Sequence, residues 1–274
     1  MSEARAGEPV RAAPPAGLAL TLWRIGFPRL RPLLGVAVLL IAWELTAAFR
    51  LIDPVLLPTP LLAFTTLVKA LLHGALLHDL YKTLYRTVVS FLIGSGIAIP
   101  LGVMLGSTEG VYRAVEFPIE FFRATPASSL FPLFLILFGV GDTTKIAVGA
   151  FGAAIVILFN VAYGVINARK TRVLAARVMG AGFWRILIDV YLWESLPQTL
   201  VGMRNGVSIA LVVIIVAEMF VGSTDGLGYR LYQAQMMIDA PMMYATIFLT
   251  GALGYVLNWF FVLIERNFVH WSGK

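Results

Sequence analysis

The chain is long enough for a large soluble core, but its composition points to a membrane. It has 274 residues, of which 59% are hydrophobic and 13% charged, with no cysteine and a formal net charge of +6. The apolar residues gather into six runs of roughly spanning length, which predicts an all-α polytopic membrane protein. The lack of cysteine excludes a disulfide framework and a cysteine-based metal site. The basic residues concentrate in loops on one side, so we expect no nucleic-acid partner.

The amino-terminal residues 1–32 are rich in Ala, Pro, Gly and Arg and have no periodic apolar face. We predict a flexible cytoplasmic tail there. Arg24, Arg29 and Arg31 precede the first apolar run, residues 33–49, which places the amino terminus in the cytoplasm. The six-helix domain is then predicted to cover residues 33–266, with a second cytoplasmic tail at residues 267–274.

An external segment is predicted at residues 50–86. Thr59 and Pro60 are a helix start signal, and apolar residues then recur at helical spacing, so an amphipathic helix is expected along the outer surface. His73 and His78 have no nearby carboxylate except Asp79, and we predict no metal site.

The second apolar run, residues 87–105, carries a stripe of small residues. Gly94, Ala98, Gly102 and Gly106 fall every four residues, which predicts that a neighbouring helix approaches closely. Pro100 is expected to kink this span.

A charged internal loop is predicted next, and the third apolar run, residues 127–140, is interrupted by proline and glycine. Broken helices at membrane depth are tolerated only where the backbone is buried in protein or lines a water-filled path. Ser128 and Ser129 are therefore candidates for a translocation path, with hydrogen bonding between helices as the alternative.

The fourth run, residues 146–166, contains Asn160, a further candidate for the path or for contact between helices. Residues 169–197 follow as a basic internal loop. Two short helices are predicted in it, separated by the glycines Gly180 and Gly182, because glycine permits a sharp turn and the close approach of another backbone.

The fifth span is predicted to begin after Pro197. It carries polar residues that are costly in a membrane and hence candidates for the path: Arg204, Asn205, Ser208 and Glu218. Arg204 could instead extend to the inner interface, and Glu218 could act at an outer gate or contact an external protein. An outer loop at residues 221–242 and a sixth span at residues 243–264 complete the chain.

Catalysis is not expected. Gly94 and Gly96 are flanked by apolar sequence without a following lysine, so the chain has no loop to hold ATP phosphates. The sequence also offers no credible pairing of a nucleophile with a base.

The 169–197 loop resembles the cytoplasmic signature of the inner-membrane permeases of ABC importers. The matching residues are Ala175, Ala176, Arg177, Gly180, Val190 and Leu192, with Pro197 where one branch of the family has a proline. Leu174 replaces the usual acidic residue, and Trp193 replaces a proline. A second resemblance, to the nitrate, sulfonate and taurine branch, rests on Arg123, Pro126, Pro132, Leu133, Phe138, Gly139, Gly141 and Lys145. The T-D-G-L-G-Y sequence at residues 224–229 is similar to a third family signature.

The resemblance implies a type I importer permease fold in a bacterial inner membrane, with both termini cytoplasmic. It also implies that seven residues couple this chain to its ATPase subunits: Ala175, Ala176, Arg177, Gly180, Gly182, Leu192 and Pro197. It also implies two ATPase subunits that bind ATP and Mg, an external substrate-binding protein, surrounding lipid, and a second permease. Because Leu174 breaks the signature, that permease could be an identical copy or a related chain. No cofactor is expected in this chain.

The substrate implied by the branch is a small oxyanion such as nitrate, a sulfonate, taurine or bicarbonate, with an aromatic vitamin or its precursor as the alternative. Two other classes stay open. An ion-coupled secondary transporter would need carboxylates at mid-membrane and usually an internal repeat, and an intramembrane enzyme would need a clustered nucleophile and base.

Overall fold

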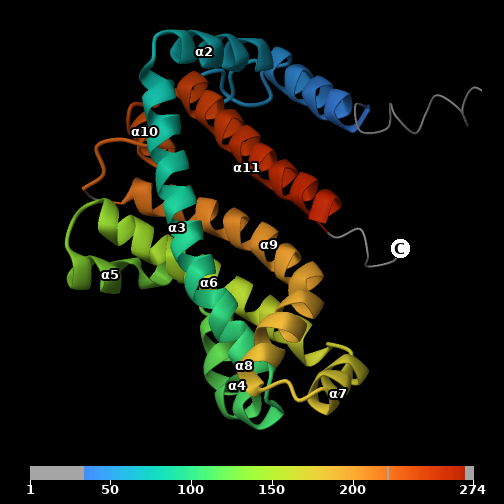
Figure 1. The fold of residues 1–274 in the computed structure, drawn as a ribbon. Coiled ribbons are helices and arrows are strands. Elements are labelled where there is room, and N and C mark those ends of the chain that lie inside the picture. Colours follow the sequence, from blue (N-terminus) through green and yellow to red (C-terminus); the bar gives the residue numbers. More distant parts are fainter. Residues whose placement is uncertain (1–33, 221, 269–274) are drawn as a thin grey trace, which may run out of the picture. The chain divides into compact units, whose positions relative to one another are not determined.

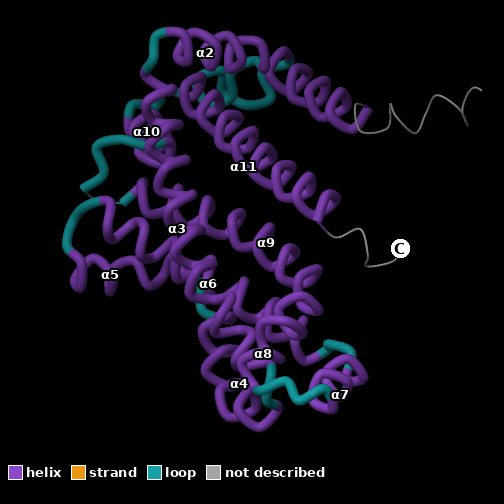
Figure 2. The backbone as a smooth tube through the Cα atoms, viewed as in Figure 1, coloured by secondary structure: helices purple, strands orange, loops and turns teal. Residues whose placement is uncertain are grey.

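The computed structural model describes residues 34–220 and 222–268, and within them every regular element is a helix (Figure 1 and Figure 2). The predicted all-α class is therefore confirmed. The chain divides into two compact units, with the boundary after Pro60. From that boundary onward the helices are α2 (Pro60–Leu72), α3 (Ala75–Gly106), α4 (Glu109–Ala124), the 3-10 helix η1 (Ala127–Leu130), α5 (Phe131–Phe138), α6 (Asp142–Ile166), α7 (Lys170–Val178), α8 (Phe183–Ile186), the π-helix η2 (Leu187–Tyr191), α9 (Leu192–Met219), α10 (Leu227–Met236) and α11 (Ala240–Phe268).

The first unit contains one apolar helix, Leu34–Ala48. The indole nitrogen of Trp43 donates a hydrogen bond to the carbonyl oxygen of Pro58 over 2.9 Å, which ties the following loop to this helix. The predicted tail at residues 1–32 lies outside the described residues.

The second unit has α3, α6 and α9 at its centre (Figure 1). The small-residue stripe of α3 packs against α6 as predicted: a β-carbon added to Gly94 would lie 2.7 Å from the carbonyl oxygen of Ala150, and one added to Gly106 would lie 2.6 Å from that of Ala162. Such short distances leave no room for a side chain, so glycine is what allows the two helices to approach.

A second stripe, on α9, packs against the same helix. A β-carbon at Gly202 would lie 2.6 Å from Cβ of Asn160, and one at Gly206 would lie 2.6 Å from Cγ1 of Ile157. Both neighbours of α6 therefore meet it through glycine, and Ile157 and Val161 of α6 are fully buried between them.

A separate apolar cluster joins α2, α3, α9, α10 and α11. Leu76 and Leu227 are fully buried at its centre, with Ala70, Leu211, Leu249 and Leu253 around them. The helix predicted after Pro60 is thus present as α2. Its buried residues are Ala63 and Ala70, whereas Leu61 and Leu72 are exposed.

Four helical segments of the described chain are long and apolar enough to cross a membrane. They are Ala75–Gly106, Asp142–Ile166, Phe183–Met219 and Ala240–Asn267. A fifth crossing is supplied if Glu109–Ala124 and Ala127–Phe138 count as one span bent by 88°. The bend lies at Thr125 and Pro126, directly before the third apolar run, and Gly139 ends α5 within that run. The first predicted span is represented by the shorter helix Leu34–Ala48.

Several predicted loops are helical in the structure. The expected charged loop before the third span is helix α4, in which Arg113 pairs with Glu109 and Arg123 with Glu120, each over 2.6 Å. Such pairs, three or four residues apart, support a helix. The segment predicted to be external, residues 50–86, is partly helical, because α3 already begins at Ala75.

The later boundaries also differ. The fifth span does not begin after Pro197, since α9 starts at Leu192 and passes through this proline. Ser195 and Gln198, on either side of Pro197, pack closely on Gly164 of α6, which holds the helix together despite the lost backbone hydrogen bond. The outer loop contains α10, and α11 includes Asn267 and Phe268, which were predicted to lie in the tail.

Candidate functional site

The predicted glycine turn is present between α7 and α8. The amide of Gly180 donates to the carbonyl of Arg177 over 2.9 Å, and that of Ala181 donates to Ala176 over 3.0 Å. Together with a φ of 80° at Gly180, these bonds form a Schellman motif, which ends a helix in a left-handed residue. Gly182 has an ordinary φ of −71° and precedes α8.

We call residues 169–191, which comprise α7, this turn, α8 and η2, the elbow segment. A small apolar core holds its two arms together: Val173 and Ala176 of α7 and Ile186 of α8 are buried, with Ala181, Val190 and Tyr191 packed against them. The ion pair between Arg172 and Glu194 ties α7 to the start of α9. The elbow segment is thus packed internally and attached to α9.

The tip of the elbow segment exposes large apolar side chains. Val178 is 89% exposed and Met179 80% exposed, and both lie directly before Gly180. Arg177 and Arg185 are exposed on the same segment, the latter paired with Asp189 at 3.4 Å. An exposed apolar tip with charges around it is typical of a surface that binds another protein.

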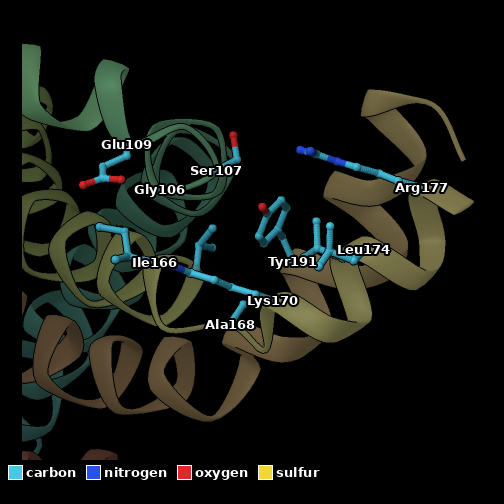
Figure 3. A pocket seen from close by; sticks show the side chains of 11 residues that line it. Gly106, Ser107, Glu109, Ile166, Ala168, Lys170, Leu174, Arg177 and Tyr191 are labelled. Carbon is cyan, nitrogen blue, oxygen red and sulfur yellow. The ribbon is translucent and has the colours of Figure 1, made fainter.

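A cavity of about 420 Å³ lies behind α7. Figure 3 shows that Arg177 extends from its helix toward Ser107, with Tyr191 beside Leu174, while Glu109 turns away. The cavity therefore separates α7 from the end of α3 and the start of α4. Its remaining lining residues are Gly106, Val165, Ile166, Ala168, Lys170 and Val173.

The elbow segment joins the fifth span without a break. Residues Phe183–Met219 form one helical segment of 37 residues, with η2 as a stretch of π-helix near its start. π-helical insertions often occur at functional sites. Of the predicted coupling residues, Ala176 is buried, Ala175, Arg177, Gly180 and Gly182 are exposed, and Leu192 and Pro197 lie half-buried in the first turns of α9.

Two of the predicted path residues share an exposed face of α9. Asn205 and Ser208 are exposed, and Val212, four residues further on, continues that face. Arg204 is half-buried and pairs with Glu265 of α11 over 3.4 Å. The broken third span packs beside this face, because a β-carbon at Gly152 would lie 3.1 Å from Ala127 of η1 and 3.3 Å from Ile209 of α9.

The other predicted path residues are placed differently. Asn160 accepts a hydrogen bond from Gln198 over 3.0 Å and donates one to the carbonyl of Val156, so it lies between α6 and α9. Ser129 is exposed and donates to the carbonyl of Pro126, while Ser128 is half-buried. Glu218 is completely buried, which leaves it no surface that a solute could reach within the described chain.

Glu218 belongs to a buried ion network that the sequence did not predict. Arg86 of α3 is 1% exposed and lies at its centre. Its guanidinium donates to Glu218 over 2.7 Å, to Asp142 of α6 over 2.6 Å, and to the side chain of Asp225 in the loop after α9. One arginine therefore joins three helices and a loop.

The G-L-G sequence is held by the same network. The amide of Gly228 donates to Glu218 over 3.0 Å, that of Leu227 to Thr83 over 2.8 Å, and that of Gly226 to Asp79 over 2.9 Å. Burial alone would raise the pKa of Asp225, but its hydrogen bond with Arg86 and the charges of Arg86 and Lys82 outweigh burial, so the pKa lies below its ordinary value.

Comparison with known proteins gives one family. Residues 98–270 match the model of the binding-protein-dependent transport system inner membrane component. A relative from Brucella abortus (strain 2308), described as a probable ABC transporter permease protein, is 31% identical over 245 residues, covering 88% of this chain and 95% of the relative.

Two further relatives carry substrate names. The taurine transport system permease protein TauC of Escherichia coli (strain K12) is 26% identical, covering 87% of this chain and 88% of the relative. The formylaminopyrimidine transport permease protein ThiX of Halalkalibacterium halodurans is 28% identical, covering 90% and 98%. Among solved structures, an inward-facing MetNI methionine ABC transporter chain is similar with a TM-score of 0.64 and 25% identity, covering 72% of this chain and 97% of that chain.

Proposed function

Because the chain belongs to the family of binding-protein-dependent transport system inner membrane components, and is the permease of an ABC importer, we propose that its elbow segment couples two ATPase subunits to transport. The observation that carries this proposal is the continuity of the elbow segment with the 37-residue helix Phe183–Met219. A force applied at the exposed tip, Val178 and Met179, would pass through the packed core of the elbow to that helix.

The proposed machine has further parts. A second permease, either another copy or a related chain, completes the path at its interface with this one, and the exposed α9 face with Asn205 and Ser208 lines that path. Ser129 lies on the broken span whose η1 helix packs beside that face. An external binding protein delivers the solute. ATP and Mg are bound by the ATPase subunits, and this chain needs no cofactor.

The proposed orientation places the elbow segment and both termini in the cytoplasm of a bacterial inner membrane. The chain has no native cysteine, so Val178→Cys provides a single labelling site. In intact cells, a membrane-impermeant maleimide should leave this cysteine unlabelled until the inner membrane is permeabilised. Labelling from the outside would contradict both the orientation and the coupling role.

For the substrate we propose a small solute with an oxyanion group, such as nitrate, a sulfonate, taurine or bicarbonate. The similarity to a taurine permease supports this. The similarity to the formylaminopyrimidine permease supports an aromatic vitamin or its precursor as the second candidate. The match covers 98% of that relative, against 88% of the taurine permease. Mass spectrometry of the ligand that co-purifies with the external binding protein would separate them, because one solute is aliphatic or inorganic and the other is heteroaromatic.

The coupling role is tested by two matched glycine substitutions. A β-carbon at Gly180 or at Gly182 meets nothing within 4 Å, so both positions have open space around them. They differ in backbone conformation, because only Gly180 has a positive φ. Valine there costs about 1–2 kcal/mol, which lowers the population of the native turn about 5- to 30-fold relative to alternatives.

We expect Gly180→Val to insert and fold but to lose most of the ATP hydrolysis that the binding protein stimulates in reconstituted complexes. Gly182 belongs to the same predicted coupling set, but its φ of −71° suits any residue, so Gly182→Val should keep that activity. If both variants show the same ATP hydrolysis coupled to uptake, the elbow segment is not the coupling element. Uptake that needs an ion gradient and no ATPase would instead support a secondary transporter.

A further inference from the structure

A groove of about 650 Å³ lies at the end of α9 that is remote from the elbow segment. It is formed by α9, the turn that follows and α10, and its walls carry Met219, Phe220, Ser223, Tyr229, Tyr232 and Gln235. Among the described residues that line it, none is charged. A space of this size falls in the range of sites that enclose small organic molecules.

The walls of the groove are fixed by packing on both sides. Phe220 stacks on Phe131 with the ring centroids 4.9 Å apart. Gly222 has a φ of 89°, and a β-carbon there would lie 2.4 Å from Cγ1 of Val140, so the turn is pressed against the end of the broken span. On the other side, Gly228 anchors α10 to α9. The groove is therefore preformed, which lowers the cost of binding.

The groove offers aromatic faces and uncharged hydrogen-bonding groups. The Tyr229 hydroxyl accepts a hydrogen bond from Gln233, which leaves its own O–H able to donate. The hydroxyl oxygen of Ser223 is buried and has no partner within the described chain. Tyr232 is 42% exposed on the same wall. Aromatic side chains with donors at their edges suit a planar organic group that carries acceptor atoms.

Positive charge at this end of the unit is already neutralised. Four cations lie near the end of α9 and the loop that follows it, and each is paired with a carboxylate of the same unit: Arg86 with Glu218, Asp142 and Asp225, Lys82 with Asp225, Lys145 with Asp142, and Arg230 with Asp79. A bare inorganic oxyanion is held best by charged donors. The groove therefore offers it little.

We propose that this groove binds the planar part of the transported solute. Of the two substrate candidates named above, the groove therefore selects the second, an aromatic or heteroaromatic compound, over an inorganic oxyanion. The inference rests on the proposed function, because the groove continues the α9 face assigned to the path. Val216 lines the groove and lies four residues beyond Val212, on the same side of the helix.

Because the chain has no native cysteine, binding in the groove can be tested by whether a ligand protects an introduced cysteine from labelling. Gln235→Cys places a thiol on its wall, and Met237→Cys places one at a position 75% exposed, at the end of the same helix but outside the groove. Each variant of the full chain, purified in lipid nanodiscs, is labelled with a fluorescent maleimide. The probes are 4-amino-2-methylpyrimidine, benzenesulfonate and nitrate at equal concentrations.

We expect the pyrimidine and the aromatic sulfonate to slow labelling at position 235 several-fold and in a saturable way, with no effect at position 237. Nitrate should leave both rates unchanged. Adding Tyr232→Ala should weaken the apparent affinity of the aromatic probes roughly 2- to 10-fold, the usual effect of losing one aromatic contact.

Equal protection by nitrate, equal slowing at both positions, or no protection by any probe would overturn the inference. The glycine test separates this failure from failure of the coupling role. If Gly180→Val abolishes coupled ATP hydrolysis while no probe protects position 235, the proposed function stands and the groove has no part in solute binding. If Gly180→Val leaves coupling intact, the proposed function fails whatever the groove binds.

Discussion

Replacing Arg86 with methionine tests whether the buried ion network stabilises the second unit. Methionine keeps much of the length of the side chain but removes every hydrogen bond that Arg86 donates to Glu218, Asp142 and Asp225. Glu218 is 0% exposed and would keep only the hydroxyl of Thr83 and an amide as partners. Breaking a buried ion pair by removing one partner costs about 3–5 kcal/mol, so we expect the free energy of unfolding to fall by that amount.

The double substitution separates charge from packing. In Arg86→Met with Glu218→Gln, a neutral amide replaces the unpaired carboxylate, so the penalty for a buried charge disappears. We expect the double variant to be more stable than Arg86→Met alone, with an interaction free energy of roughly 1–3 kcal/mol. Arg113→Met is the matched control. It removes an ion pair whose two side chains are 73% and 78% exposed, and such pairs contribute at most about 1 kcal/mol.

Unfolding can be followed by tryptophan fluorescence in mixed micelles at increasing concentrations of sodium dodecyl sulfate. Two results would refute the reasoning. One is an Arg86→Met variant that unfolds at the same detergent fraction as Arg113→Met. The other is a double variant whose loss of stability equals the sum of the losses measured for Arg86→Met alone and for Glu218→Gln alone, because additivity would mean that Arg86 and Glu218 do not interact.

Two further predictions concern packing and the elbow segment. Gly106→Ala should lower the free energy of unfolding by about 1–3 kcal/mol, because its β-carbon would lie 2.6 Å from the backbone of Ala162. In Gly96→Ala the added β-carbon meets nothing within 4 Å, so this variant should raise the free energy of unfolding by up to about 1 kcal/mol in the same detergent titration. Equal shifts would contradict the close approach of α3 and α6. Glu194→Gln should weaken the tie to Arg172 and speed hydrogen exchange of the α7 amides, and unchanged exchange would show that this pair does not hold α7.

Packing between the central helices could be predicted from the sequence because it leaves a periodic signal. One side of α3 carries only small residues: Gly94, Ala98, Gly102 and Gly106. In an apolar environment, a helix face of small residues indicates close contact with another helix. The turn at Gly180 was predictable for a similar reason, since two nearby glycines interrupt a run of good helix formers. Both signals are local.

The ion network could not be predicted because its partners are far apart in the chain. Arg86 is 56 residues from Asp142, 132 from Glu218 and 139 from Asp225. A single sequence gives the ends of apolar runs only approximately, so it cannot show that these four charges lie at one level of the helix bundle. Arg86 was therefore assigned to an external segment, and Glu218 to the path.

The continuity of α8, η2 and α9 connects the elbow segment to the buried ion network. At a rise of about 1.5 Å per residue, the helix from Phe183 to Met219 is roughly 55 Å long. One end emerges from the elbow segment, and Glu218 at the other end is held by Arg86 and the G-L-G backbone. No loop interrupts this helix in the described chain, so a displacement of the elbow segment has two possible outcomes. Either the displacement moves the ion network together with α3 and α6, or it is taken up as a change of twist at the π-helical stretch Leu187–Tyr191. In that stretch the backbone hydrogen-bond register already departs from the α-helix.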